Sequence, residues 1–395
     1  MRTVRDLECK GKIVVVRSDF DVPMSSDGTI IDDFRIRAAL PTIQFLKEAG
    51  ARQIILVAHL GRPVVRPREK IERIRQGNPR LSLEPIAKRL KKLLGESTEK
   101  INTRKFGEFP LPAFIITRGI YLVENIWFDW RETENDGVFA RSIAQLGDQF
   151  VYDAFAVSHR AQASTSSAAK EAREAVAGLR LLQEVGSLSK LSIETAHPYV
   201  MVLGGAKVST KLPVIERLLN HVDHFLLGGV MANTFAKAQG MDVKRSTVEL
   251  SEVNTAGSLL KAHPEKFTLP EDYVWQQQKI MDIGTKTREH YRHELESAQE
   301  IFWNGTVGVT SLTAQDFKFG TQDIAKAIAA NRQALTIVSG GDTVGAIHEA
   351  KISLESYSFV STGGGATIEF LAGLKLPALE ALGYYRPESF PATKE

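Results

Sequence analysis

The chain has 395 residues, of which 43% are hydrophobic, and a formal net charge of +3. Its length favours two or three domains, and its nearly balanced charge gives no general argument for binding to nucleic acid or to a membrane. A single cysteine, Cys9, excludes an intramolecular disulfide and is typical of a reducing compartment. Because no apolar run approaches the ~18 residues of a spanning helix and no signal peptide is recognisable, we expect a cytoplasmic protein.

Hydrophobic patterns of the strand and helix type alternate along the first part of the chain. Strands are predicted at residues 13–16, 54–57, 120–123 and 150–152, and helices at 38–49, 83–94 and 137–146. This alternation is typical of an α/β fold with parallel strands and right-handed crossovers. The alanine- and serine-rich segment 163–169 marks the expected end of this unit, and a helix near 181–194 would lead to the next.

Charged side chains follow the first two of these strands, and one further arginine lies between them. They are Arg17, Asp19, Asp21, Arg35, His59 and Arg62. The carboxyl ends of parallel strands meet at one edge of the sheet, where open α/β folds bind ligands. The basic side chains can therefore converge on a small anion that carries carboxylate or phosphate groups. The alternative is a set of surface salt bridges.

A basic stretch runs from Arg62 to Arg80 and could be interpreted as a nucleic-acid patch. It contains three prolines and no aromatic residue. We interpret it as a solvated loop that adds positive field near the anion site, and we expect no nucleic-acid partner.

The second part of the chain alternates in the same way, and glycine turns follow its predicted strands. Strands are predicted at 199–203, 224–227, 300–303, 335–338 and 359–361, and glycine turns at 204–205, 228–229, 340–341 and 363–365. A glycine turn that opens a helix exposes backbone N–H groups to phosphate, and Lys207 and Lys211 can lie on one helix face. Each turn alone could be purely structural, but together they predict a nucleotide site. Neither a Walker loop nor a Gly-x-Gly-x-x-Gly fingerprint is present.

The order and identity of these motifs resemble the phosphoglycerate kinase family, from Val14 to about Leu382. The matching motifs are Asp19-Phe20-x-Val22-Pro23, His59-Leu60-Gly61-Arg62-Pro63, Gly204-Gly205-Ala206-Lys207-Val208-Ser209, and those at residues 35–41, 82–85, 124–125, 153–155, 159–161, 303–305, 340–343 and 361–366. Any one of them could arise by chance. So many in the right order identify the chain as a member of the family.

The resemblance implies an α/β architecture of two Rossmann-like three-layer domains with parallel sheets, joined by an interdomain helix, with the substrate cleft between them. We expect a phosphoglycerate-binding domain at 1–175, the interdomain helix or hinge at 176–196, and a nucleotide-binding domain at 197–372. The segment 373–395 would return to the N-terminal domain. A monomer is expected.

The implied reaction is reversible, Mg²⁺-dependent phosphoryl transfer between 1,3-bisphosphoglycerate and ADP, which gives 3-phosphoglycerate and ATP. The expected partners are these small molecules, and the expected cofactor is Mg²⁺ with ATP or ADP; no membrane partner is expected. A carboxylate acceptor is already ionised and nucleophilic at neutral pH. The chemistry therefore requires positioning and charge cancellation, and it needs no general base.

The resemblance also implies roles for individual residues. The implied catalytic residues are Arg35, Lys207 and Gly364. The implied phosphoglycerate-binding residues are Asp19, Asp21, Arg35, His59, Arg62 and Arg160. The implied nucleotide-binding residues are Gly205, Ala206, Lys207, Lys211, Gly229, Asn304, Gly305, Val309, Gly341, Asp342, Thr343, Gly363, Gly364 and Gly365. Asp342 would carry the Mg²⁺ ion.

Departures from the family pattern gather at two places. In the acceptor site, Asp21 stands where the family has asparagine and Trp127 where it has arginine. In the nucleoside site, Val230 and Ile280 replace glycines and Ser311 replaces a glutamate. We therefore expect a weakened acceptor site, a lowered KM after Trp127→Arg, and poor nucleotide selectivity. The alternative is a family member with lost or changed activity, in a regulatory or binding role or with another acid or nucleotide as substrate.

Overall fold

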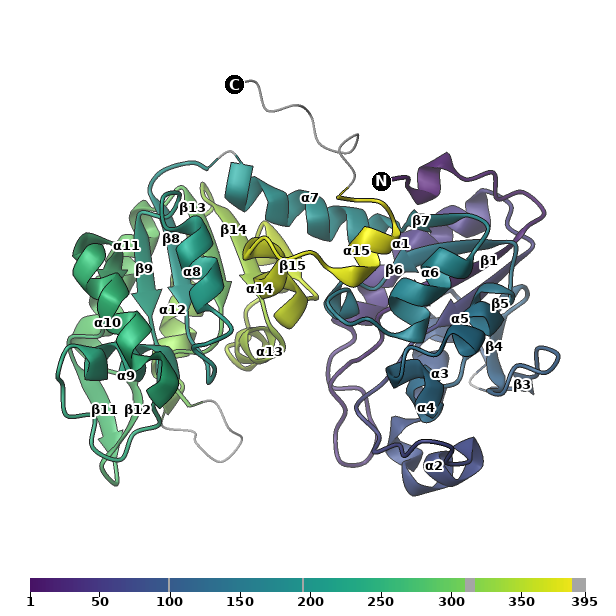
Figure 1. The fold of residues 1–395 in the computed structure, drawn as a ribbon, viewed down its shortest axis with the longest axis horizontal. Helices are drawn as coiled ribbons and strands as arrows, with labels where there is room; N and C mark the ends of the chain where they lie inside the picture. The colour runs from purple at the N-terminus through teal and green to yellow at the C-terminus, as the bar shows by residue number, and fades with distance from the viewer. Residues whose placement is uncertain (99, 194, 310–316, 386–395) are drawn as a thin grey trace. The chain divides into compact units, whose positions relative to one another are not determined.

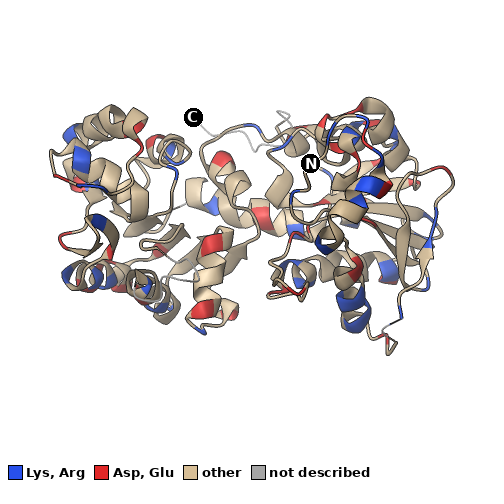
Figure 2. Ribbon diagram, turned by 90° about the horizontal axis from the view of Figure 1, so that it is seen from below, with Lys and Arg blue, Asp and Glu red and all other residues tan. Residues whose placement is uncertain are grey.

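The computed structural model describes residues 1–395 except 99, 194, 310–316 and 386–395. The chain forms two compact units: unit 1 contains Met1–Glu184 and the segment from Lys375, and unit 2 contains Val185–Leu374. In each unit, helices pack on a central sheet (Figure 1). Basic and acidic residues are interspersed over both units (Figure 2), in keeping with the small net charge. Within the described residues, no helix has both the length and the apolar character that a membrane crossing requires.

Unit 1 contains a seven-stranded sheet in the order β3-β4-β5-β2-β1-β6-β7. Its strands are β1 (Ile13–Ser18), β2 (Gln53–Val57), β3 (Thr103–Arg104), β4 (Ala113–Thr117), β5 (Ile120–Val123), β6 (Gln149–Asp153) and β7 (Ala175–Ala177). In this sheet order, the neighbouring strands β5, β2, β1, β6 and β7 pair in parallel. Strands β3 and β4 form an antiparallel edge next to β5. Val14, Val15 and Val16 are all fully buried, as expected for a central strand that is covered on both faces.

The helices of unit 1 lie in the chain segments between and after its strands. They are α1 (Phe34–Glu48), α2 (Ile71–Gly77), α3 (Glu84–Leu93), α4 (Trp130–Thr133), α5 (Gly137–Ala144), α6 (Ala168–Glu171) and α15 (Pro377–Ala381). In α3, Ile86, Ala87 and Leu90 are buried at the spacing of one helix face. The C-terminal helix α15 belongs to this unit, and the Ala378 N–H donates to the Ser158 carbonyl.

Unit 2 contains a six-stranded parallel sheet in the order β10-β9-β8-β13-β14-β15, and a separate hairpin, β11–β12. The strands are β8 (Tyr199–Leu203), β9 (His224–Leu227), β10 (Phe267–Thr268), β11 (Tyr273–Gln276), β12 (Lys279–Ile283), β13 (Glu300–Asn304), β14 (Leu335–Ser339) and β15 (Phe359–Ser361). The helices are α8 (Leu212–Leu218), α9 (Gly229–Ala238), α10 (Val253–Ala262), α11 (Thr285–Ser297), α12 (Phe319–Ala330), α13 (Gly341–Glu349) and α14 (Gly365–Leu371). Helix α7 (Leu179–Ile193) begins in unit 1 and ends in unit 2.

The predicted α/β class with mostly parallel sheets is confirmed. The chain does not leave unit 1 at 163–169, however, because Ala163, Ser164, Thr165 and Ser166 are buried and β7 still follows, paired with β6. The composition of this segment reflects small side chains packed in the interior. The antiparallel edge and the β11–β12 hairpin were not predicted, since such short strands carry little periodicity.

Candidate functional site

A charged cluster lies at the carboxyl ends of β1 and β2 in unit 1. We define it by the residues Asp19, Asp21, Arg35, His59, Arg62 and Arg160. The charges of Arg35, Arg62 and Arg160 all act on the pKa of His59, which lies among them. The structure therefore brings together the residues that the sequence predicts for the anion site.

Two carboxylates organise the charged cluster. Arg35 donates from Nη1 to Asp19 Oδ2 at 2.8 Å, and Asp19 is only 5% exposed. Asp21 Oδ1 accepts the Gly61 N–H at 2.8 Å and so holds the loop that follows β2. Burial and the neighbouring charge of Asp19 raise the pKa of Asp21, and the Gly61 N–H and Arg35 oppose that rise.

His59 is a neutral member of the charged cluster. Arg17 Nη2 lies 3.3 Å from His59 Nδ1, and because a guanidinium can only donate, Nδ1 is the acceptor and the proton lies on Nε2. Burial and the positive charge of Arg17 lower the pKa of His59 well below its usual value. His59 Nε2 lies 3.8 Å from Asp21 Oδ2. The imidazole can therefore act as a hydrogen-bond donor without carrying a charge.

Arg17 lies beneath the charged cluster and is fully buried. Its Nε donates to Ser164 Oγ at 2.8 Å, and Ser164 donates from Oγ and N to the buried Glu132, at 2.6 and 2.8 Å. The prediction that Arg17 binds the anion is wrong, because its hydrogen bonds are made inside the protein. Arg17 instead supports His59.

Trp127 packs against two members of the charged cluster, His59 and Arg160. The Trp127 and His59 ring centroids are 4.3 Å apart, and Arg160 Cζ lies 5.3 Å from the Trp127 ring centroid. Burial, together with the charge of Arg160, lowers the pKa of His159 to about 4. Arg62, which begins the basic loop, is exposed and also acts on His159.

In unit 2, the glycine turns after β8 and β9 meet the turn after β13. The Gly204 N–H donates to the Asn304 carbonyl at 3.0 Å and the Gly205 N–H to the Thr306 carbonyl at 2.8 Å. A Cβ at Gly204 would lie 2.2 Å from Thr306 O, so only glycine permits this approach. The prediction that this turn exposes its own N–H groups is wrong for Gly204 and Gly205, whose donors are already used.

The remaining turns of unit 2 are also linked to one another. Gly305 has φ +93°, and its N–H donates to the hydroxyl of the buried Thr343 at 2.8 Å. Asn304 Nδ2 donates to the Ser339 carbonyl, and the Gly229 N–H to the Val307 carbonyl. These groups fix the shape of the turns.

The last two glycine turns open helices α13 and α14. The Gly363 N–H donates to Ser361 Oγ at 3.1 Å, whereas Gly364 and Gly365 begin α14. A Cβ at Gly364 would lie 3.8 Å from Gly340 Cα, so the two turns are neighbours. Gly341 begins α13 and places Asp342 in its first turn.

Two lysines follow the first glycine turn. Lys211 is 7% exposed, and burial lowers its pKa, although the charges of Asp342 and Glu249 oppose this. Lys207 is exposed. Between them, the Val208 N–H donates to Glu249 Oε2 at 2.6 Å. Sequence reasoning missed Glu249, since it is 41 residues from Val208 and belongs to no charged motif.

A cavity of about 370 Å³ opens beside these turns. We call it the glycine-lined cavity. Its lining includes the predicted nucleotide residues Gly205, Ala206, Gly229, Val309 and Asp342, together with Val230 and Ile280. Ser311 lies outside the described residues. The lining also includes Asn233, whose Oδ1 has no hydrogen-bond partner in the part of the chain that the structure describes.

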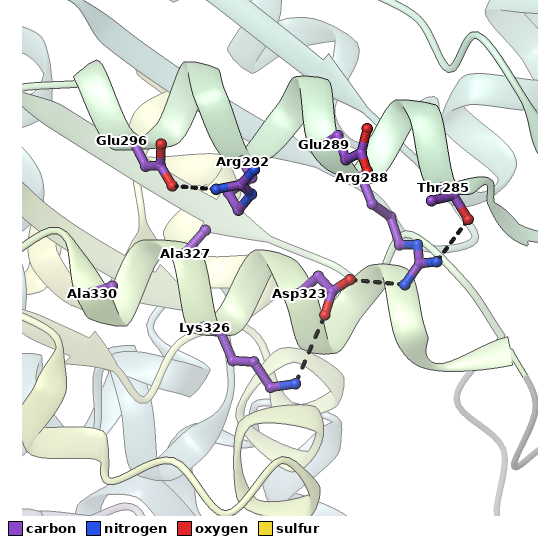
Figure 3. A pocket seen from close by; sticks show the side chains of 9 residues that line it. All are labelled: Thr285, Arg288, Glu289, Arg292, Glu296, Asp323, Lys326, Ala327 and Ala330. Atoms are coloured by element: carbon purple, nitrogen blue, oxygen red, sulfur yellow. Dashed lines mark hydrogen bonds and ion pairs between the residues drawn. The ribbon is translucent and has the colours of Figure 1, made fainter.

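A second cavity, of about 460 Å³, lies between α11 and α12 (Figure 3). Its basic side chains are paired with acidic ones. Arg288 contacts Asp323 at 2.8 Å, and Arg292 contacts Glu296 at 2.9 Å. Lys326 lies 3.8 Å from Asp323. This paired surface is a poorer candidate for anion chemistry than the glycine-lined cavity.

The described residues contain no group of three or more His, Cys, Asp or Glu side chains that could hold a metal ion. Asp342, on the edge of the glycine-lined cavity, is a single carboxylate. Mg²⁺ is commonly bound by one or two carboxylates together with phosphate oxygens and water. Asp342 therefore fits a Mg²⁺ ion that arrives with a nucleotide.

Comparisons with known proteins agree with this geometry. A family model described as phosphoglycerate kinase matches residues 4–374. A phosphoglycerate kinase of Chloroflexus aurantiacus is 41% identical over 411 residues, which cover 96% of this chain and 98% of the relative. The solved phosphoglycerate kinases of Coxiella burnetii and Pyrococcus horikoshii superpose with TM-scores of 0.77 and 0.79, at 36% and 31% identity, over 96% and 99% of this chain and 98% and 100% of theirs. The chain therefore belongs to the phosphoglycerate kinase family.

Proposed function

We propose that this protein transfers a phosphoryl group reversibly between 1,3-bisphosphoglycerate and ADP, forming 3-phosphoglycerate and ATP. The observation that carries the proposal is the charged cluster, in which three arginines surround a neutral histidine, in a chain that matches the family over 4–374. No observation favours the alternative of a binding protein with lost activity.

Unit 1 is the proposed acceptor side. Arg62 and Arg160 would bind the phosphate of 3-phosphoglycerate, because guanidinium groups match phosphate oxygens. His59 would donate from Nε2 without adding a charge. The attacking carboxylate is ionised at neutral pH, so a site without a general base is sufficient. Asp19 and Asp21 would hold Arg35 and the Gly61 loop in place, and Asp19 would also contact the acid.

Unit 2 is the proposed nucleotide side. Lys211 would contact phosphate oxygens, and Asn304, Gly305, Val309 and the glycine turns would shape the cavity. Asp342 would hold Mg²⁺, with Thr343 beside it. The bound ion would supply positive charge that neutralises the phosphates. The N–H groups at the starts of α13 and α14, around Gly341 and Gly364–Gly365, would add positive field at the phosphates.

The proposed transition-state contacts come from both units. Arg35 and Lys207 would stabilise the charge on the transferring group. Gly364, in the turn next to Gly340, is the third proposed catalytic residue.

The proposed domain division is an acceptor domain at 1–175, a hinge helix at 176–196, a nucleotide domain at 197–372 and a returning segment at 373–395. Hinge movement would bring the two substrates together and exclude water. We further propose a cytoplasmic monomer with no nucleic-acid or membrane partner.

A coupled assay tests the function directly. Purified protein should consume ATP only when 3-phosphoglycerate and Mg²⁺ are both present. Glycerate, which lacks the phosphate, is the matched control for the acceptor site. A folded protein that shows no 3-phosphoglycerate-dependent turnover at millimolar substrate would contradict the proposal.

A further inference from the structure

Trp127 is fixed to the loops of the charged cluster by its neighbour in the chain. It lies in a short helical turn, Ile126–Phe128, that follows β5. Asn125 Oδ1 accepts the Trp127 N–H at 3.1 Å, and Asn125 Nδ2 donates to the carbonyls of Leu60 and Leu81 at 2.7 and 2.8 Å. The Trp127 backbone is thereby held against the loop that carries His59.

The Trp127 ring is in contact with two cluster residues from other loops. Its centroid lies 4.3 Å from that of His59, at an interplanar angle of 38°. Arg160 Cζ, from the segment after β6, lies 5.3 Å from the ring centroid, within the distance at which a guanidinium is attracted to an aromatic face. Trp127 is 4% exposed and His59 2% exposed, so little water competes with these contacts.

The indole N–H indicates that this position needs more than apolar volume. Trp127 Nε1 is buried and has no hydrogen-bond partner among the residues that the structure describes. An unpartnered buried donor is destabilising, and a phenylalanine would avoid that cost. Tryptophan, however, has the ring that attracts a cation most strongly. Its presence is therefore explained if the ring face itself is used.

We propose that Trp127 is a positioning residue of the acceptor site: its ring, in contact with both Arg160 and His59, holds these two side chains in the orientation that binds the phosphate of the acid. The proposal rests on the proposed function of unit 1. It explains how the site tolerates a neutral residue where the family has an arginine. Trp127 adds no charge, so it acts by restricting the side chains that do bind the anion.

This role predicts a specific kinetic signature. Trp127→Leu removes the aromatic face, and we expect the KM for 3-phosphoglycerate to rise about tenfold, a change of ~1.4 kcal/mol. Trp127→Phe keeps a smaller ring and should raise it about threefold. The KM for ATP should stay within twofold in both variants. A matched control is Trp130→Leu, which removes a tryptophan three residues away and should leave both KM values unchanged.

A positioning role also requires coupling to Arg160. In an Arg160→Ala background, Trp127→Leu should raise the KM for 3-phosphoglycerate by less than a further twofold, because the side chain that the ring holds is gone. Because Trp127→Leu does not change the net charge, the dependence of this KM on salt should match the wild type. Multiplicative effects in the double variant would overturn the proposal. So would equal effects of the Leu and Phe variants, or equal increases in the KM values for both substrates.

Binding measurements separate this proposal from the proposed function. Calorimetry with 3-phosphoglycerate alone compares the wild type, Trp127→Phe and Trp127→Leu without turnover. An affinity for 3-phosphoglycerate that decreases from the wild type to Trp127→Phe and further to Trp127→Leu supports the positioning role, even if the wild type does not transfer phosphate. Equal binding by folded variants, checked by circular dichroism, overturns it even if the wild type is an active kinase.

Discussion

Units 1 and 2 prepare their candidate sites with different chemical groups. In unit 1, charged side chains hold one another: Arg35 pairs with Asp19, and Asp21 holds the Gly61 loop. In unit 2, backbone groups hold one another, as where the Gly205 N–H bonds to the Thr306 carbonyl. Side chains that follow strands can be recognised in a sequence, whereas bonds between distant turns cannot. The sequence therefore indicates the side chains of the charged cluster directly, but not the backbone hydrogen bonds that shape the turns of unit 2.

The two units share one feature, a buried carboxylate near each end of α7. In unit 1, Asp153 Oδ1 accepts the Leu181 N–H at 2.9 Å in the first turn of the helix. In unit 2, Glu300 Oε2 accepts the Ala196 N–H at 3.0 Å just beyond its last turn. Burial raises the pKa of Asp153 to about 7, against hydrogen bonds from Thr42 and Leu181. Burial likewise raises the pKa of Glu300 to about 7, against the Ala196 N–H.

The largest expected effect is on stability and comes from Asp153. Its folded pKa exceeds its unfolded value, so its stabilising contribution is full below about pH 4 and is lost as the pH rises through about 7. The loss is at most about 4 kcal/mol, at 1.36 kcal/mol per pKa unit. The asparagine of Asp153→Asn cannot ionise. The free energy of unfolding of this variant, measured by urea titration, should therefore rise relative to that of the wild type as the pH increases from 5 to 8.

Glu300→Gln provides the comparison in unit 2. Its effect should have the same sign and the same pH window, since the pKa of Glu300 is raised in the same direction. If the stability difference between wild type and variant does not change with pH in either unit, the carboxylates are ionised in the folded protein and the comparison fails.

The next largest effect is expected on turnover when one cationic side chain is removed from either unit. Arg35→Ala and Lys207→Ala should each lower kcat about 100-fold or more, because losing one donor to transition-state charge commonly costs about 3 kcal/mol. Steady-state rates at saturating substrate measure the loss, and circular dichroism checks folding. Arg35 is 22% exposed and Lys207 is exposed, so neither change should unfold the protein. Near wild-type turnover in both variants would remove their proposed roles.

A smaller effect is expected at the metal. Asp342→Asn should raise the Mg²⁺ concentration for half-maximal rate roughly 10- to 100-fold. The reason is that Asp342 is the only carboxylate among the described residues that line the glycine-lined cavity. Rates measured against free Mg²⁺ at fixed ATP give this value. Complete removal of Mg²⁺ with EDTA is the control and should abolish turnover. An unchanged Mg²⁺ requirement would place the ion elsewhere.

The sequence predicted the central strands and the charged cluster because both leave direct signals. The run Val14–Val16 is apolar throughout, Asp19 comes directly after β1, and His59 is the second residue after β2. It could not predict that Arg17 is internal, because that depends on Ser164, 147 residues away. It also could not predict that the Gly204 donor is used, because its partner, Asn304, lies on another strand.

The smallest expected effect concerns selectivity for the nucleobase. Val230 and Ile280 line the glycine-lined cavity. Because the family pattern is expected to have glycines at these positions, we expect a narrower space for a flat base. In the proposed function, Lys207, Lys211 and Asp342 would contact phosphate and metal without reading the base. We therefore expect kcat/KM for ATP and GTP to agree within about tenfold, a difference of ~1.4 kcal/mol.

The alternative is that other lining residues, such as Asn233 with its unpartnered Oδ1, rebuild a selective adenine pocket. Comparing kcat/KM for ATP, GTP, ITP and CTP distinguishes the two, and an ATP preference beyond 100-fold would refute poor selectivity. The variant Val230→Gly, Ile280→Gly sharpens the test. It should lower the KM for ATP and leave the KM for 3-phosphoglycerate unchanged, because both substitutions lie in unit 2 and the charged cluster lies in unit 1.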